Sequence, residues 1–256
     1  MQAPEIPAHP HISAVLITKN AGARLHECLD SLKWAGEIVV LDSGSSDNTE
    51  AICAAFHARF SVESDWPGFG IQKNRALALA TGDWVFSIDA DEICTPELRA
   101  EIQDAVSRGD AEAYALPRLS NFCGHWMRHG GWWPDHVTRL FRRNAASFSD
   151  DVVHERLIVE GRTGLLKNHL LHYTYDTLDQ ALEKMNRYST LGAEQAFRRG
   201  KRASLLTAWL RGGWAFLRTY FLRAGFLDGT AGYVLARYNA QGTYYKYLKL
   251  RYLGKL

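Results

Sequence analysis

The sequence predicts an α/β protein with a mostly parallel sheet flanked by helices, followed by a C-terminal helical extension that is basic and aromatic. Strand-like and helix-like segments alternate over the first hundred residues, which is typical of a parallel sheet covered by helices. Residues 1–170 hold 16 Lys and Arg against 23 Asp and Glu, whereas residues 171–256 hold 14 against 5. This change in charge predicts two domains, 1–170 and 171–256.

Short β-branched apolar runs predict the strands. They lie at residues 12–18, 37–42, 60–64 and 84–89, and again at 111–119 and 136–143. Apolar residues at helical spacing predict helices at 23–33, 47–56, 71–80 and 96–106. Beyond Tyr173 the pattern is helical over 177–199, 204–223 and 230–252, and Thr177 with Gln180 predicts a capping box for the first of these helices.

Polar side chains follow the predicted strands, at the edge where an open parallel sheet binds ligands. Thr18 and Asn20 end the first strand, Asp42 ends the second, and Asp89 and Asp91 follow the strand at 84–89. In extended backbone Asp89 and Asp91 would point the same way, and paired carboxylates suit Mg²⁺ or Mn²⁺ that takes further oxygens from a substrate diphosphate. The alternative is an acidic loop ahead of the helix that Pro96 begins, and we expect this role for Glu92.

Other residues near these strand ends suit a nucleotide. Asp42 can accept hydrogen bonds from a base imide or a ribose hydroxyl, whereas Asp47 either does the same or only caps a helix. "GFGIQKN" at 68–74 lacks the third glycine of a dinucleotide fingerprint. It nevertheless places Lys73 and Asn74 near a helix start, where amides and cations suit a diphosphate.

Four blocks in this order, "AVLITKN", "EIVVLDSGSSDNT", "GIQKNRALALATGDWVFSIDADE" and "VHERL", resemble family 2 glycosyltransferases of the inverting GT-A type. "HGGWWPDHVTRLFRR" and "GFLDGTAGYVLARYNAQGTYYKYLKL" look like the glucosyltransferases that add β-linked glucose to heptose of the lipopolysaccharide inner core. The resemblance implies a Rossmann-like GT-A domain over 1–170 that binds a nucleotide-sugar and carries catalysis. It also implies that UDP-glucose is the donor and that a heptose of the inner core is the acceptor. A polyprenyl phosphate or another glycan is the alternative acceptor.

The resemblance also implies residue roles. Thr18, Asn20, Asp42 and Asp47 would surround the nucleotide, with Lys73, Asn74 and Asp89 near the nucleotide-sugar. Asp91 would be the main metal ligand, joined by Asp89. In "DDVVHERL" Glu155 would be the catalytic base. Many relatives have an Asp within an E-D pair there, so Asp150 or Asp151 is the alternative, and Glu155 would then pair with Arg156 or Arg139.

The loop at 121–135 is rich in tryptophan and histidine. Trp132 and Trp133 are candidate acceptor-binding residues, because indole faces stack on sugar rings. His154, which lies outside this loop, is a third candidate. The alternative is a loop pinned to the core by its aromatic side chains. His125 and His129 have the i,i+4 spacing of zinc ligands on a helix, but Gly124, Gly130 and Gly131 break any helix there, so we favour no metal in this loop.

The apolar residues between 205 and 227 recur at helical spacing with arginines among them, which predicts a basic amphipathic helix in a membrane interface or a helical subdomain. No run of 18 apolar residues or signal peptide is visible, and the four cysteines show no C-x-x-C. We expect a cytoplasmic protein, peripheral on the inner face of the bacterial inner membrane. Its expected partners are a nucleotide-sugar, a lipid-anchored saccharide and an anionic membrane surface, but no nucleic acid. The alternative functional classes are a nucleotidyltransferase and a non-catalytic module that binds a sugar or a nucleotide.

Overall fold

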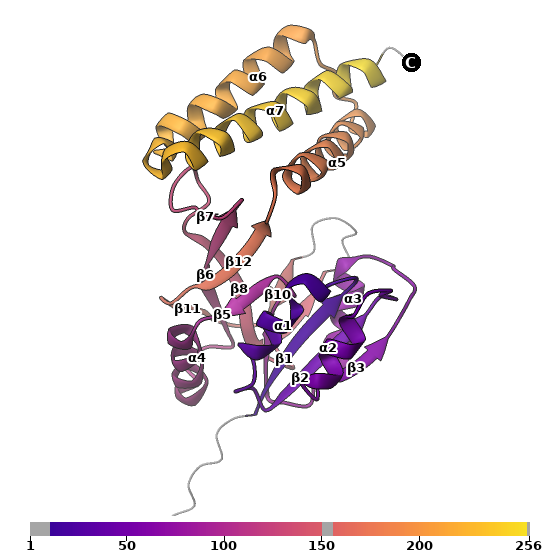
Figure 1. Ribbon diagram of the computed structural model, residues 1–256, viewed down its shortest axis with the longest axis vertical. Coiled ribbons are helices and arrows are strands. Elements are labelled where there is room, and N and C mark those ends of the chain that lie inside the picture. Colours follow the sequence, from indigo (N-terminus) through magenta and orange to yellow (C-terminus); the bar gives the residue numbers. More distant parts are fainter. Residues whose placement is uncertain (1–10, 150–155, 255–256) are drawn as a thin grey trace, which may run out of the picture. The chain divides into compact units, whose positions relative to one another are not determined.

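The computed structural model describes residues 11–149 and 156–254 (Figure 1). The chain forms two compact units. Unit 1 comprises Met1–Arg118 and His136–His172, and unit 2 comprises Leu119–Asp135 and Tyr173–Leu256. The second unit thus includes the tryptophan-rich loop as well as the C-terminal helices.

The parallel part of the main sheet carries the predicted strand ends. Its strands are β1 (Ile12–Thr18), β2 (Glu37–Asp42), β3 (Arg59–Val62) and β4 (Trp84–Ser87). They lie in the order β3-β2-β1-β4, and β1 pairs in parallel with both β2 and β4. Thr18 and Asp42 stand opposite each other in register, so two predicted strand ends meet at one edge.

The rest of the sheet is mixed. After β4 the strand order continues β8-β6-β12-β5, with β8 antiparallel to β4 and β5 antiparallel to β12. These strands are β5 (Glu92–Cys94), β6 (Ala113–Phe122), β8 (Asp135–Arg142) and β12 (Leu170–Tyr175). The short strands β7 (His125–Trp126) and β11 (Thr163–Leu165) pair with β6, and β9 (Ala146–Phe148) pairs with β10 (Leu157–Val159) in a separate two-stranded sheet. The strands predicted near 111–119 and 136–143 are confirmed, whereas β12 was not predicted.

Helices cover both faces of the parallel strands. They are α1 (Gly22–Asp30), α2 (Thr49–Ala55), α3 (Phe69–Ala78) and α4 (Pro96–Arg108). Ala14 and Leu16 belong to a core with α1 and α4, whereas Val15 belongs to a second core with Ala76 of α3. Side chains alternate along a strand, so burial on both faces explains why β1 and β2 read as continuous apolar runs.

Unit 2 is built on three long helices. They are α5 (Leu178–Arg198), α6 (Leu205–Leu217) and α7 (Gly229–Leu253), with the π-helical turn η1 (Arg218–Leu222) and the 3₁₀ turn η2 (Gly225–Asp228) between α6 and α7. The predicted capping box of Thr177 and Gln180 begins α5. Lys249 of α7 donates to Asn186 Oδ1 at 2.7 Å, which fastens α7 to α5. None of the helices within the described ranges has the length and apolar character to cross a membrane.

Candidate active site

The carboxylate of Asp42 organises the loop that follows β2. The Thr18 hydroxyl donates to one of its oxygens at 2.8 Å, and the amides of Gly44 and Ser45 donate to the other at 2.8 and 2.7 Å. Thr18 and Asp42 are both buried. Thr18 and Asp42, which were predicted to lie near a nucleotide, therefore hold this loop in place. Asp42 does so by accepting hydrogen bonds from backbone amides of the loop.

Asn20 and Asp47 lock the same loop to the end of β1. Asn20 accepts from the Ser46 amide at 2.9 Å and adopts a left-handed conformation, φ 52°, which asparagine tolerates. Asp47 accepts from the Thr49 hydroxyl at 2.6 Å and from the Gly22 amide at 2.9 Å. The hydroxyl of Thr49, together with the backbone amides of Gly22 and Thr49, holds the pKa of Asp47 below its ordinary value. The structure thus brings together all four residues predicted around the nucleotide.

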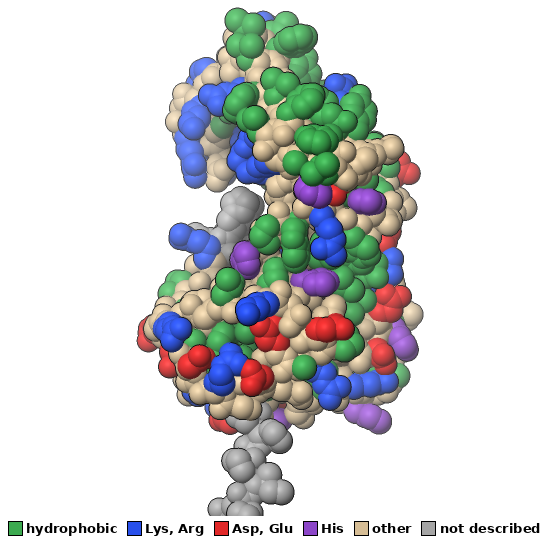
Figure 2. All heavy atoms as spheres, turned by 90° about the vertical axis from the view of Figure 1, so that its left-hand side faces the viewer, with side chains coloured by type: hydrophobic (Ala, Val, Ile, Leu, Met, Phe, Trp, Pro, Cys, Tyr) green, Lys and Arg blue, Asp and Glu red, His purple; other side chains and the backbone are tan. Residues whose placement is uncertain are grey.

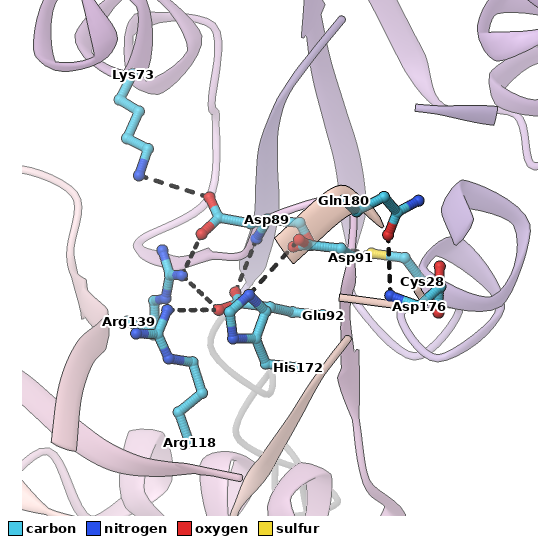
Figure 3. A network of polar contacts seen from close by, with 10 residues as sticks. All are labelled: Cys28, Lys73, Asp89, Asp91, Glu92, Arg118, Arg139, His172, Asp176 and Gln180. Carbon is cyan, nitrogen blue, oxygen red and sulfur yellow. Dashed lines mark hydrogen bonds and ion pairs between the residues drawn. The ribbon is translucent and has the colours of Figure 1, made fainter. Parts of the chain in front are cut away.

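Asp89 lies between two cations (Figure 3). Arg139 of β8 donates to Asp89 Oδ2, and Lys73 Nζ of α3 lies 3.5 Å from Asp89 Oδ1. Burial alone would raise the pKa of Asp89, but the charges of Arg139 and Lys73 outweigh it and hold this pKa well below its ordinary value. Asp89 is therefore an ionised carboxylate that joins strand β4 to α3 and β8.

Glu92 is not the exposed helix-entry acid that the sequence suggested. Its side chain is fully buried and accepts from Arg139 at 2.6 Å and from Arg118 at 3.3 Å. Its other oxygen accepts from the Asp89 amide at 2.9 Å. The helix-entry expectation was wrong because Glu92 begins β5, the last strand of the sheet, with its side chain buried, and a buried carboxylate needs positive partners. Thr95 is the actual cap of α4.

Asp89 and Asp91 contact different charged partners within one polar network (Figure 3). Strand β4 ends at Ser87, and the chain turns so that the Glu92 amide donates to the Asp89 carbonyl at 3.0 Å. Alternation along an extended strand therefore does not apply here. Asp89 faces Lys73 and Arg139, while Asp91 Oδ2 lies 3.5 Å from His172 Nε2.

Asp91 and His172 form a donor pair that fits a divalent cation. Asp91 is partly exposed, and the two side chains supply a carboxylate oxygen and an imidazole nitrogen, ligands that suit a metal such as Mn²⁺. Among the described residues no group of three or more His, Cys, Asp or Glu could hold a metal. The pair would thus depend on further oxygens, such as those of a diphosphate. Sequence reasoning missed His172, because only the pairing of β12 with β5 brings it near Asp91.

Asn74 contacts the backbone of β9. Its amide donates to the Phe148 carbonyl and its oxygen accepts from the Phe148 amide, both at 2.8 Å. The Lys73 ammonium lies 5.4 Å from the centre of the Phe148 ring. One turn of α3 therefore contacts both Asp89 and the strand that precedes residue 150. Glu155, His154, Asp150 and Asp151 lie outside the described residues.

In unit 2 the tryptophan-rich loop is held by aromatic contacts and by Asp228 at the end of η2. The Trp132 ring lies 5.7 Å from Phe122, and the Trp133 ring has the Arg128 guanidinium 5.8 Å from its centre. Asp228 accepts from the His129 amide at 2.8 Å and lies 2.9 Å from His129 Nδ1. His129 therefore has a carboxylate partner that explains its position without the zinc ion considered above.

Comparison with known proteins agrees with this geometry. Residues 13–158 match the family model described as glycosyl transferase family 2. The lipopolysaccharide core biosynthesis glycosyltransferase LpsC of Rhizobium meliloti (strain 1021) is 33% identical, over 96% of this chain and 96% of LpsC. An uncharacterized glycosyltransferase of Rickettsia felis is 30% identical, over 94% of this chain and 89% of its own length.

Two solved structures share the fold. The mannosyltransferase PcManGT from Pyrobaculum calidifontis, in complex with GDP-Man and Mn²⁺, superposes with a TM-score of 0.53 at 18% identity, covering 94% of this chain and 76% of PcManGT. TarS residues 1–349 of S. aureus, in complex with UDP, gives a TM-score of 0.50 at 16% identity, covering 96% and 91% of the two chains. The predicted GT-A fold is confirmed. From its sequence match and its strand-end site together, the chain belongs to glycosyl transferase family 2.

Proposed function

We propose that this protein transfers glucose from UDP-glucose to a heptose of the lipopolysaccharide inner core, with inversion at the anomeric carbon. The observation that carries the proposal is the similarity to LpsC over nearly the full length of both chains. Because the similarity includes unit 2 as well as the strand-end site, it supports a related acceptor and not only a related donor.

The strand-end residues of unit 1 supply the donor site in this proposal. The loops held by Asp42, Asp47 and Asn20 would receive the nucleoside, and Lys73 would face the sugar diphosphate. Asp91 and His172 would hold Mg²⁺ or Mn²⁺. When bound, such an ion neutralises charge on a leaving diphosphate. Asp89 would act beside the metal site, because Arg139 and Lys73 already pair with it.

Glu155 is the proposed base, with Asp150 and Asp151 as alternatives. A base on the acceptor side takes the proton of the attacking heptose hydroxyl as the new bond to C1 forms and the bond from C1 to the diphosphate breaks. Attack from the face opposite the leaving group turns an α-linked donor into a β-linked product. Support for Glu155 comes from its block, "DDVVHERL".

The catalytic test supplies purified protein and Mn²⁺ with a panel of nucleotide-sugars and three acceptors: heptose-terminated core lipopolysaccharide, polyprenyl phosphate and water alone. We expect a β-linked glucose on heptose, found by mass spectrometry and NMR. Glu155→Gln should keep donor binding and lose transfer, whereas Asp150→Asn and Asp151→Asn should retain it. Transfer to polyprenyl phosphate alone would overturn the proposed acceptor, and turnover by Glu155→Gln would overturn the proposed base.

A further inference from the structure

Unit 2 exposes an unusual number of large apolar side chains between residues 205 and 227. This apolar surface consists of Leu205, Leu206, Trp209, Leu210, Trp214 and Leu217 of α6, Phe221 and Leu222 of η1, and Phe226 and Leu227 of η2. Trp209 is 71% exposed, Leu222 68% and Leu206 65%. Single exposed apolar residues are common, but a run of ten over three adjoining elements indicates an interaction surface.

The apolar surface is not the face with which α6 packs on its own unit. Ala208 and Gly212 of α6 are buried, and a Cβ at Gly212 would lie only 3.0 Å from the Tyr244 Cβ of α7. At about 100° per residue, Leu206 and Leu210 project roughly 160° away from that packed face. Helix α6 is therefore apolar on both sides, and a helix of that kind normally has both sides covered.

The segment of the chain that carries the apolar surface is almost entirely positive in charge. Residues 200–256 contain ten Lys and Arg and one acid, Asp228, which is buried against His129. Arg211 and Arg218 are exposed within α6 and η1 themselves. Figure 2 shows hydrophobic side chains gathered in the upper part of its view, with Lys and Arg along their left-hand margin. Such a surface favours an anionic partner and disfavours a second copy of the same positive face.

We propose that the apolar surface docks on an anionic lipid bilayer, with α6 lying in the plane of the interface. The leucine and phenylalanine side chains would enter the acyl boundary, Trp209 and Trp214 would lie at headgroup depth, and Arg211 and Arg218 would meet lipid phosphates. Thirteen residues of α6 extend about 20 Å, which is too short to span a bilayer but long enough to lie on one.

A groove beside this surface fits the same partner. Its volume is about 590 Å³, and it is lined by aromatic and small residues of α6 and α7, with Trp209 and Leu217 shared with the apolar surface and Arg237 also in its lining. A Cβ added at Gly213, in the lining, would meet no atom within 4 Å. The groove therefore offers room for part of an acyl chain next to a cation.

Vesicle flotation tests the proposal with the full chain and without sugar donor or acceptor. The docking proposal rests on the proposed function and deepens it, because it names the surface on which the protein would meet a lipid-anchored acceptor. Flotation measures binding alone and needs no turnover. We expect flotation with phosphatidylcholine vesicles that contain phosphatidylglycerol, weaker flotation with phosphatidylcholine alone, and release by salt. Leu206→Glu combined with Leu222→Glu should reduce the partition coefficient by at least about 100-fold.

Leu165→Glu is the matched control. Leu165 of β11 in unit 1 is 63% exposed and does not belong to the apolar surface, so the same leucine-to-glutamate change is tested elsewhere. It should float like the wild type, and unchanged thermal midpoints would show that all variants fold. Wild-type protein that fails to float, or equal flotation of the double variant, would overturn the proposal. A dimer that the double variant converts to a monomer, without vesicle binding, would assign the surface to a second copy instead.

Discussion

The imidazole Nε2 of His172 lies 3.5 Å from the carboxylate Oδ2 of Asp91. The two residues are 81 positions apart in sequence, and only the antiparallel pairing of β12 with β5 brings them together. Neither side chain is a metal site alone, but as a pair they offer oxygen and nitrogen ligands where the chain passes from β4 to β5. The proposed metal chemistry depends on this pair.

Replacing His172 by asparagine should weaken metal-dependent donor binding. With Mn²⁺ present, we expect UDP-glucose affinity to fall at least about tenfold, since one of two protein ligands is lost. Without metal, wild type and variant should bind equally weakly. Isothermal titration calorimetry measures both. His136→Asn, in β8, is the control, and an equal loss in that variant would show that the effect is not specific to the pair.

Glu92→Gln should destabilise unit 1. The substitution keeps the shape of the side chain but removes the charge that faces Arg118 and Arg139, so it leaves buried guanidinium charge poorly compensated. We expect the free energy of unfolding to fall by about 3 kcal/mol in urea titrations. Glu97→Gln, an exposed change in the first turn of α4, should cost less than about 1 kcal/mol. Similar values for the two would contradict the buried network.

Asn74→Ala should act mainly on stability. It removes both hydrogen bonds to the Phe148 backbone and should lower the free energy of unfolding by about 2 kcal/mol. Asn74→Asp keeps the acceptor for the Phe148 amide but turns a carboxylate oxygen toward the Phe148 carbonyl, so its loss should be at least as large. Asn144→Ala, in the exposed turn before β9, is the control. Donor affinity that falls while stability is unchanged would instead place Asn74 in direct contact with the nucleotide-sugar.

Asp228→Asn should impair transfer without affecting the donor site. The substitution removes the negative charge and leaves one acceptor oxygen in place of the two that contact the Arg128 and His129 amides and the His129 ring, so η2 holds the tryptophan-rich loop less firmly. We expect a lower kcat/KM for the saccharide acceptor and an unchanged Kd for UDP-glucose. Asp179→Asn, exposed at the start of α5, should change neither quantity. A weakened donor Kd would contradict this separation.

Local patterns in the sequence predict much of the fold. The apolar runs at 12–18 and 37–42, the Pro96 start of α4 and the Thr177 capping box all depend on neighbouring residues, and the structure contains each of them. Strand β12 was missed because "LLHYTY" is short and only half-buried, and its partner β5 has only three residues. Such strands are defined by distant pairing and not by their own pattern.

The site was predictable where residues follow long strands and not where the chain turns. Thr18 and Asp42 meet because parallel register places consecutive strand ends side by side. The alternation argument that related Asp89 to Asp91 does not apply, because β4 ends at Ser87. Their shared role at a metal stays a prediction. The burial of Glu92 and its pairing with Arg139 also depend on β8, which lies about fifty residues further along the chain.

The most direct test of the account is calorimetric titration of UDP-glucose into wild-type protein and Asp91→Ala, each with Mn²⁺ and with EDTA. We expect Mn²⁺ to strengthen binding of UDP-glucose to the wild type and Asp91→Ala to lose this gain, with affinity lower by roughly 100-fold, or about 2.8 kcal/mol. Asp83→Ala, an exposed aspartate just before β4, should bind like the wild type. Unchanged UDP-glucose affinity of Asp91→Ala in the presence of Mn²⁺ would contradict the proposed metal-dependent donor site.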